Sequence, residues 1–144
     1  MLTDIQATLS DEQAFAATGV STDYYDAGAI YDWSRGEPMG VLVTVDVAAD
    51  SGTGDETYSF SVETDNDDAF GSATTLVTKT VAAADLQVGD KVVLPFHIGA
   101  EQFTRLAATL GGTTPSITIT AEVKPLCDIA TETSDLPAGY TVTV

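Results

Sequence analysis

Basic residues are scarce in this chain of 144 residues. Five Lys and Arg stand against 22 Asp and Glu, which gives a formal net charge of −17 at pH 7. A protein that binds DNA or RNA needs cations to neutralise phosphates, so this balance argues against nucleic-acid binding. The acidic residues are spread along the chain, and two interpretations stay open: a solvated surface that keeps the protein soluble, or adaptation to salty surroundings that screen self-repulsion.

Cysteine and histidine are almost absent. The single cysteine, Cys127, cannot form an internal disulfide, so nothing indicates an oxidising compartment, and we interpret it as a small apolar side chain. The single histidine, His97, would have to serve any Ser-His-Asp triad, Cys-His pair or histidine metal cluster. Because no G-x-S-x-G motif accompanies it, we expect a protein that is not an enzyme, with no catalytic residue.

Long hydrophobic runs are also missing. No apolar segment approaches the roughly 18 residues of a membrane span, and no basic, apolar leader opens the sequence. We therefore expect a soluble protein without membrane contact that is intracellular at synthesis. A single domain of this size can bury roughly 68–70% of its unfolded surface, so a core needs neither metal nor disulfide.

The two-residue alternation typical of β-strands is abundant. Within residues 41–47, four valines at odd positions share one face, and Leu42, Thr44 and Asp46 share the other. The same pattern puts further apolar side chains on one face of two other segments: Tyr58, Phe60, Val62, Ile117, Ile119, Ala121 and Val123. We expect these faces to form the core.

Turn signals separate the alternating segments into about eight short strands. We expect them at residues 13–18, 22–26, 39–50, 56–64, 74–80, 91–96, 104–110 and 115–124. Many short strands of this kind predict a β-sandwich or barrel. Pro125 ends the last of them, and residues 140–144 have high β propensity, so they can pair with their own sheet or with a neighbour's edge.

Two groups of residues have the chemistry of a binding site. Asp65, Asp67 and Asp68 are candidate ligands for a hard cation such as Ca²⁺, although the segment lacks the glycine and distal glutamate of an EF-hand loop. The alternative is a solvated loop whose carboxylates bond their own backbone. Aromatic residues can line a sugar-binding surface, or fill a core or an interface: Tyr24, Tyr25, Tyr31, Trp33 and Tyr58.

Five segments, taken in order, resemble the jelly-roll capsid cement, or decoration, proteins of tailed double-stranded-DNA bacteriophages. They are LSDEQA at 9–14, STDYYDAG at 21–28, GEPMGVLVTV at 36–45, TDNDDAFGSATTL at 64–76 and RLAATLGG at 105–112. The resemblance extends over residues 2–124, and the order and spacing of the segments carry it. Two features depart from that family: residues 96–98, where relatives show a proline-rich turn, and the longer tail beyond Pro125.

The resemblance implies a structural protein without enzymatic activity or cofactor. Such a protein sits on the outer capsid surface of the virion, bridges neighbouring major capsid proteins and clamps the expanded shell against DNA pressure. Members of the family look like dimers or other small homo-oligomers. We therefore expect an all-β, single-domain sandwich of jelly-roll type at 13–124, with an N-terminal arm at 1–12 and a C-terminal extension at 125–144.

Contact residues are expected in the arm, in the loop after residue 28, among the scarce cations and in the tail. The candidates for partner binding are Leu2, Ile5, Tyr31, Trp33, Arg35, Arg105, Leu126, Tyr140 and Val142. Partial core packing is the alternative for Trp33, and pairing with local carboxylates is the alternative for the two arginines.

Two other functions stay open. Jelly-roll sandwiches also serve as carbohydrate-binding or host-attachment modules, which predicts a concave, aromatic-lined site. A small hydrolase that uses His97 is the third possibility, and replacing His97 with alanine would then abolish its activity.

Overall fold

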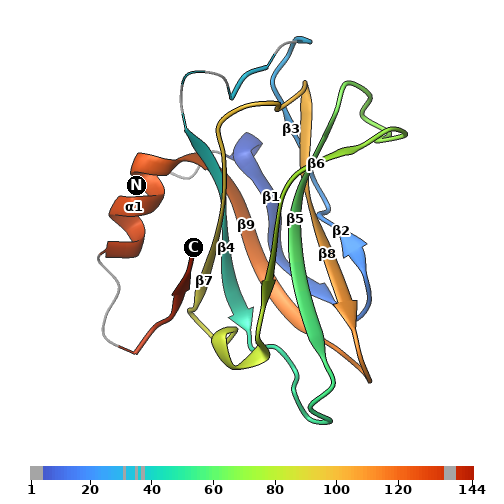
Figure 1. Cartoon of the computed structure of the whole chain (residues 1–144), viewed down its shortest axis with the longest axis vertical. Coiled ribbons are helices and arrows are strands. Elements are labelled where there is room, and N and C mark those ends of the chain that lie inside the picture. The colour runs from blue at the N-terminus through green and yellow to red at the C-terminus, as the bar shows by residue number, and fades with distance from the viewer. Residues whose placement is uncertain (1–4, 31, 35, 37, 135–138) are drawn as a thin grey trace.

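The computed structural model describes residues 5–30, 32–34, 36, 38–134 and 139–144. Two β-sheets pack face to face, and one α-helix lies outside them (Figure 1). The described elements, in chain order, are η1 (Ile5–Ala7), β1 (Thr8–Phe15), β2 (Gly19–Val20), β3 (Tyr25–Asp26), β4 (Met39–Val47), β5 (Thr57–Asp65), β6 (Thr74–Val81), η2 (Ala83–Asp85), β7 (Lys91–Phe96), β8 (Phe103–Gly111), β9 (Ile117–Pro125), α1 (Leu126–Ser134) and β10 (Val142–Thr143). In the described part of the chain, no helix is long and apolar enough to cross a bilayer.

The strand order confirms the expected all-β sandwich of jelly-roll type. The first sheet has the order β1-β9-β4-β7-β10, and the second has the order β2-β8-β5-β6, with β3 also pairing β8. All pairs are antiparallel except β10 with β7. If β2 and β3 count as two pieces of one strand, the chain forms two four-stranded sheets, and most connections cross from one sheet to the other. This is the jelly-roll arrangement, with β10 added at one edge.

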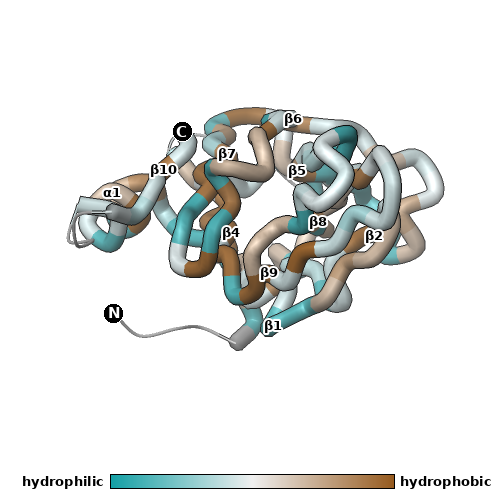
Figure 2. The backbone as a smooth tube through the Cα atoms, turned by 90° about the horizontal axis from the view of Figure 1, so that it is seen from below, coloured by the Kyte–Doolittle hydropathy of each residue, from teal (hydrophilic) through white to brown (hydrophobic). Residues whose placement is uncertain are grey.

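The core lies between the sheets, on the faces that the alternation predicts. Tyr58, Phe60 and Val62 of β5 are fully buried there, as are the valines at 41, 43 and 45 of β4 and the apolar positions of β9. Figure 2 shows the two layers from below, with hydrophobic residues concentrated in strands such as β4 and β7. Val47 is the exception and is 57% exposed, because the register between β4 and β9 shifts after Val45.

The N-terminal strand corrects the expected arm at residues 1–12. β1 begins at Thr8 and pairs with β9, so residues 8–12 belong to the first sheet. Two register shifts interrupt this pairing, and Glu12 has a positive φ of 44°. A bulged strand does not show a clean two-residue period, which is why alternation did not reveal it. The strands expected at 13–18 and 22–26 are correspondingly shorter, as the end of β1 and the two-residue strands β2 and β3.

The described residues of the C-terminal segment, 125–134 and 139–144, fold onto the first sheet. Helix α1, which we did not predict, lies on the outer face of that sheet, where Ile129 is buried against Leu42 and Val93. Leu126 and Val142 pack around the same contact. Strand β10 pairs with β7, so the segment at 140–144 joins its own sheet, one of the two alternatives left open by the sequence.

Candidate interaction surfaces

Three loops meet at one end of the sandwich, the upper end in Figure 1. We call this surface the loop end; it consists of the described residues in 27–38, 66–73 and 97–102. The Asp32 carboxylate accepts a hydrogen bond from the Gly99 amide at 2.9 Å, and the Ser34 hydroxyl accepts one from the Ala100 amide at 3.2 Å. The Gln102 amide donates to the Asn66 side chain at 3.2 Å. These bonds hold the three loops against one another.

Trp33 anchors the first of these loops. Its indole Nε1 donates to the Glu101 carbonyl at 2.8 Å, and its ring lies 4.8 Å from the Tyr25 ring and 5.5 Å from the Phe96 ring, between centroids. The half-buried side chain packs on the core, which is the alternative that the sequence left open for it. Trp33 therefore fixes the loop and offers only part of its surface to a partner.

Large apolar side chains project from the loop end. Ile30 is 72% exposed and Ile98 is 56% exposed. Ile30 also lines a hollow of about 290 Å³ together with residues of the other two loops: Asp32, Asn66, Gly99, Ala100 and Glu101. Exposed isoleucines on loops that are tied together leave apolar area for another protein to cover. The alternation and turn signals did not single out Ile30 or Ile98, since neither lies in a strand.

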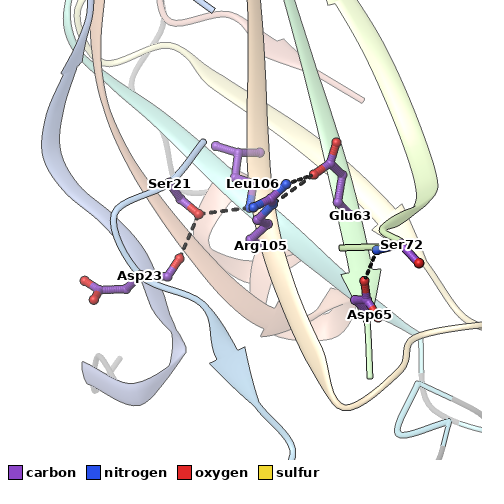
Figure 3. A network of polar contacts seen from close by, with 7 residues as sticks. All are labelled: Ser21, Asp23, Glu63, Asp65, Ser72, Arg105 and Leu106. Atoms are coloured by element: carbon purple, nitrogen blue, oxygen red, sulfur yellow. Dashed lines mark hydrogen bonds and ion pairs between the residues drawn. The ribbon is translucent and has the colours of Figure 1, made fainter. Parts of the chain in front are cut away.

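Arg105 is occupied within the chain. Its Nε and Nη2 atoms both lie 2.8 Å from one carboxylate oxygen of Glu63 (Figure 3), and its guanidinium carbon lies 4.2 Å from the centre of the Phe70 ring. This is the local pairing that we considered as the alternative to a contact role. Tyr24 completes the cluster, with its ring edge-on to Phe70 and to Phe103.

A second hollow, of about 400 Å³, lies beside Tyr24. It is lined by Gln6, Thr8, Asp23, Tyr24 and Asp26. Ser21 shapes the neighbouring backbone, because its hydroxyl donates to the Asp23 carbonyl at 2.7 Å and accepts from the Leu106 amide at 3.1 Å (Figure 3). The Tyr24 side chain is 42% exposed, so part of it stays open to solvent at this hollow.

The acidic segment after β5 uses its carboxylates to shape its own loop. The two carboxylate oxygens of Asp65 accept from the amides of Asp67 at 3.1 Å and Ser72 at 2.8 Å, the latter drawn in Figure 3. Asp67 in turn accepts from the Ala69 amide at 3.0 Å, and Asp68 is exposed. Among the described residues, no three His, Cys, Asp or Glu side chains gather as metal ligands.

The tail candidates lie against the first sheet. The Tyr140 ring covers Gly89 so closely that an added Cβ would clash with a ring carbon, so only glycine fits at this position. The buried Asp90 carboxylate accepts from the Thr141 amide at 2.7 Å and from the Gln87 amide at 2.9 Å. Sequence reasoning missed Asp90, because only the folded tail brings Thr141 to it.

Four of the other partner-binding candidates have side chains that the structure does not describe. Leu2, Tyr31 and Arg35 lie outside the described residues, and the side chain of Ile5 is likewise not described. His97 is exposed at the loop end.

Most of the described Lys and Arg side chains form ion pairs or hydrogen bonds within this chain. Lys124 lies 2.7 Å from Glu122 and 2.8 Å from Glu132, and the Lys91 ammonium donates to the Thr44 hydroxyl at 2.9 Å. Arg105 pairs with Glu63 as described above. With 22 acidic residues in the chain, these few contacts leave a surface dominated by negative charge.

Comparisons with known proteins show which family the chain belongs to. A solved structure from infectious bursal disease virus, Gt strain, is similar with 15% sequence identity and a TM-score of 0.33, over 81% of this chain and 29% of the viral chain. The chain therefore spans less than a third of the length of that viral protein. A search of curated proteins found no match. A family model described as Bbp16 matches residues 9–123, from β1 to β9, and the chain thus belongs to the Bbp16 family.

Proposed function

We propose that this protein is a capsid cement, or decoration, protein of a phage head. It binds the outer surface of the capsid and bridges neighbouring major capsid proteins, which stabilises the expanded shell. Its partners in this proposal are the major capsid protein and further copies of itself as a dimer or other small homo-oligomer. It needs no cofactor, performs no catalysis and touches neither nucleic acid nor membrane.

The loop end is the observation that carries this proposal. Ile30 and Ile98 are both more than half exposed, on loops that are hydrogen-bonded to one another. Loops that are ordered before binding lose little conformational entropy on docking, so the apolar area they bury contributes more fully to affinity. A rigid molecule with apolar side chains at one end is better suited to holding two proteins together than to catalysis.

The charge balance supports the same role. Arg105, Lys91 and Lys124 contact groups of this chain, so they do not make the surface basic. An acidic surface favours a partner with basic residues around its apolar contact, and it makes association faster at low salt. It also keeps the protein away from packaged DNA.

The segments that resemble phage decoration proteins support the proposal from the sequence side. Four of the five segments lie wholly within the strands and loops between β1 and β6, and the fifth, at 105–112, falls in β8 and the turn after it. All of them lie in the region matched by the Bbp16 family model. The jelly-roll order of the strands agrees with the fold that this resemblance implies.

The test is co-sedimentation with mature phage capsids from which the decoration layer has been stripped. Wild-type protein should bind saturably and restore resistance to heat. The Ile98→Asp variant, which charges the loop end, should bind at least about tenfold more weakly, because burying an unpaired carboxylate is costly. Val47→Asp is the matched control: Val47 is 57% exposed, but lies where β4 ends, away from the loop end.

Two outcomes would contradict this proposal. Wild-type protein that fails to sediment with capsids at every salt concentration would exclude a cement role. Equal losses for Ile98→Asp and Val47→Asp would show that the loop end does not make the contact.

The carbohydrate-binding alternative rests on the hollow beside Tyr24. An exposed ring flanked by the carboxylates of Asp23 and Asp26 is a suitable platform for a sugar. This function predicts glycan binding by the isolated protein, measured with and without Ca²⁺, and its loss in Tyr24→Ala. Glycan binding that survives Tyr24→Ala would exclude this hollow as the site.

A further inference from the structure

Each of the two sheets has two edges, and three of these four edges are visibly protected. β1 is interrupted by two register shifts and by the positive φ of Glu12. β10 covers the start of β7, and the outer side of β8 carries β2 and β3. Bulges, short strands and covering segments are the ordinary means by which proteins keep sheet edges from pairing with other chains.

β6 is the fourth edge, and no described strand covers it. It is eight residues long and consists almost entirely of threonine and valine or leucine, which favours strand pairing. Val62 pairs with Val77 and Glu63 pairs with Thr75, so Leu76 is an inserted residue that bulges the strand. The regular part of the edge is therefore residues 77–81.

Lys79 lies at the centre of this regular part. It is directly opposite Phe60, whose side chain is fully buried in the core, so its Cβ is on the core-facing side of the sheet. Its neighbours Thr78 and Thr80 face outward, with hydrogen bonds to Ser61 and Ser59. The half-buried Lys79 places the only charge of β6 on the inner face of the edge.

A second copy that paired here would meet this charge. Two β6 strands related by a two-fold axis pair antiparallel, and over residues 77–81 the longest symmetric register puts Lys79 opposite Lys79 of the copy. Like charges directly opposite on one face destabilise a strand pair. Other registers shorten the regular paired stretch or bring the Leu76 bulge into it.

We propose that Lys79 is a charge gate, which keeps the open edge of β6 from pairing with β6 of another copy. The gate goes beyond the proposed capsid role and is independent of it. It lets the protein stay free of edge-to-edge β6 pairs at high concentration. Copies that meet on a shell then do so through another surface.

A charge swap tests the gate in the full chain. Lys79→Glu alone still puts like charges opposite each other, so it should associate no more than wild type. An equimolar mixture of wild type and Lys79→Glu puts Lys opposite Glu, and should associate about three- to tenfold more tightly than either protein alone. Lys79→Val should self-associate, and Lys79→Arg, which keeps the charge, should behave as wild type.

Sedimentation velocity at about 0.15 M salt, where the repulsion between acidic copies is largely screened, measures the association, and hydrogen exchange of the β6 amides locates it. Far-UV circular dichroism checks that each variant is folded; if Lys79→Glu is not, Lys79→Val and Lys79→Gln carry the test by themselves. The gate is supported by association with new protection in β6. It is overturned if neither the mixture nor Lys79→Val associates beyond wild type, or if the association leaves β6 unprotected.

Discussion

Two buried threonines that face each other in the second sheet differ in the hydrogen bonds that their hydroxyl groups make. Thr64 and Thr104 are directly opposite in the β5–β8 register, and both are fully buried. The Thr64 hydroxyl donates to the Phe103 carbonyl at 2.8 Å and accepts from the Glu101 amide at 2.7 Å. The Thr104 hydroxyl has no hydrogen-bond partner among the described residues. The Thr64 hydroxyl thus links the loop end to the sheet. The Thr104 hydroxyl, in contrast, is removed from water without gaining a hydrogen bond from the described residues.

Replacing each threonine with valine should therefore change stability in opposite directions. Thr104→Val should raise the free energy of unfolding by about 1 kcal/mol, because it removes a buried hydroxyl that gains nothing. Thr64→Val should lower it by about 1–3 kcal/mol, because it leaves the Glu101 amide and the Phe103 carbonyl without their partner. Urea unfolding curves at pH 7 measure both. A marked loss of stability in Thr104→Val would show that this hydroxyl is hydrogen-bonded in solution.

At the scale of elements, helix α1 is held to the sheet by an apolar contact and by a charged one. Ile129 supplies the apolar contact, and Lys124 of β9 bridges Glu122 of its own strand to Glu132 of the helix. Burial by itself would lower the pKa of Lys124, but hydrogen bonds to the two carboxylates and their charge outweigh it and raise the pKa above its usual value.

The bridge from Lys124 to the helix should fail at high pH. Because the pKa of Lys124 is higher in the folded chain than in the unfolded chain, its ion pairs stabilise fully below the unfolded value of 10.5 and are lost as pH rises through the folded value. Glu132→Gln should therefore cost up to about 1 kcal/mol at pH 8 and less at pH 11, as measured by urea unfolding. A cost that stays constant across this range would contradict an ionic bridge.

At the scale of the whole molecule, the excess of carboxylates, with a net charge of −17, makes the surface groups repel one another. Only a few carboxylates of the described residues pair with cations, so most of this repulsion acts across the surface. Screening by salt weakens such repulsion over about 10 Å at 0.1 M ionic strength, a short distance compared with the molecule. The free energy of unfolding should therefore depend strongly on ionic strength.

Adding NaCl should stabilise the protein at neutral pH. Between about 0.05 M and 1 M salt, the thermal midpoint at pH 7 should rise by several degrees, because screening removes self-repulsion that the expanded unfolded chain feels less. Near the isoelectric point of 4.1 the same salt series should have little effect, because the net charge is close to zero. Calorimetry at the two pH values checks this, and an equal gain at both would attribute the effect to something other than charge.

Regular alternation is what made most of the fold predictable. β4 to β9 lie within a few residues of their expected positions, because each has an apolar face of period two that a sandwich must bury. The features that failed break that period: the bulged β1, the register shift that exposes Val47, and α1. α1 has nine residues, two of them threonine and one serine, a composition that favours a helix little on its own. It forms where Leu42 and Val93 offer an outward-facing apolar patch.

The candidate interaction surfaces could be predicted only in part, because they too involve residues outside the regular two-residue alternation. The sequence by itself determined the two-sheet core and the acidic surface, since both follow from residue type and local period. Only the tertiary structure decided that Arg105 and Trp33 are engaged within the chain, that Ile30 and Ile98 project from loops that meet, and that Lys79 lies opposite Phe60 at an open edge. Each of these depends on pairing between residues far apart in the chain, and local pattern does not carry that information.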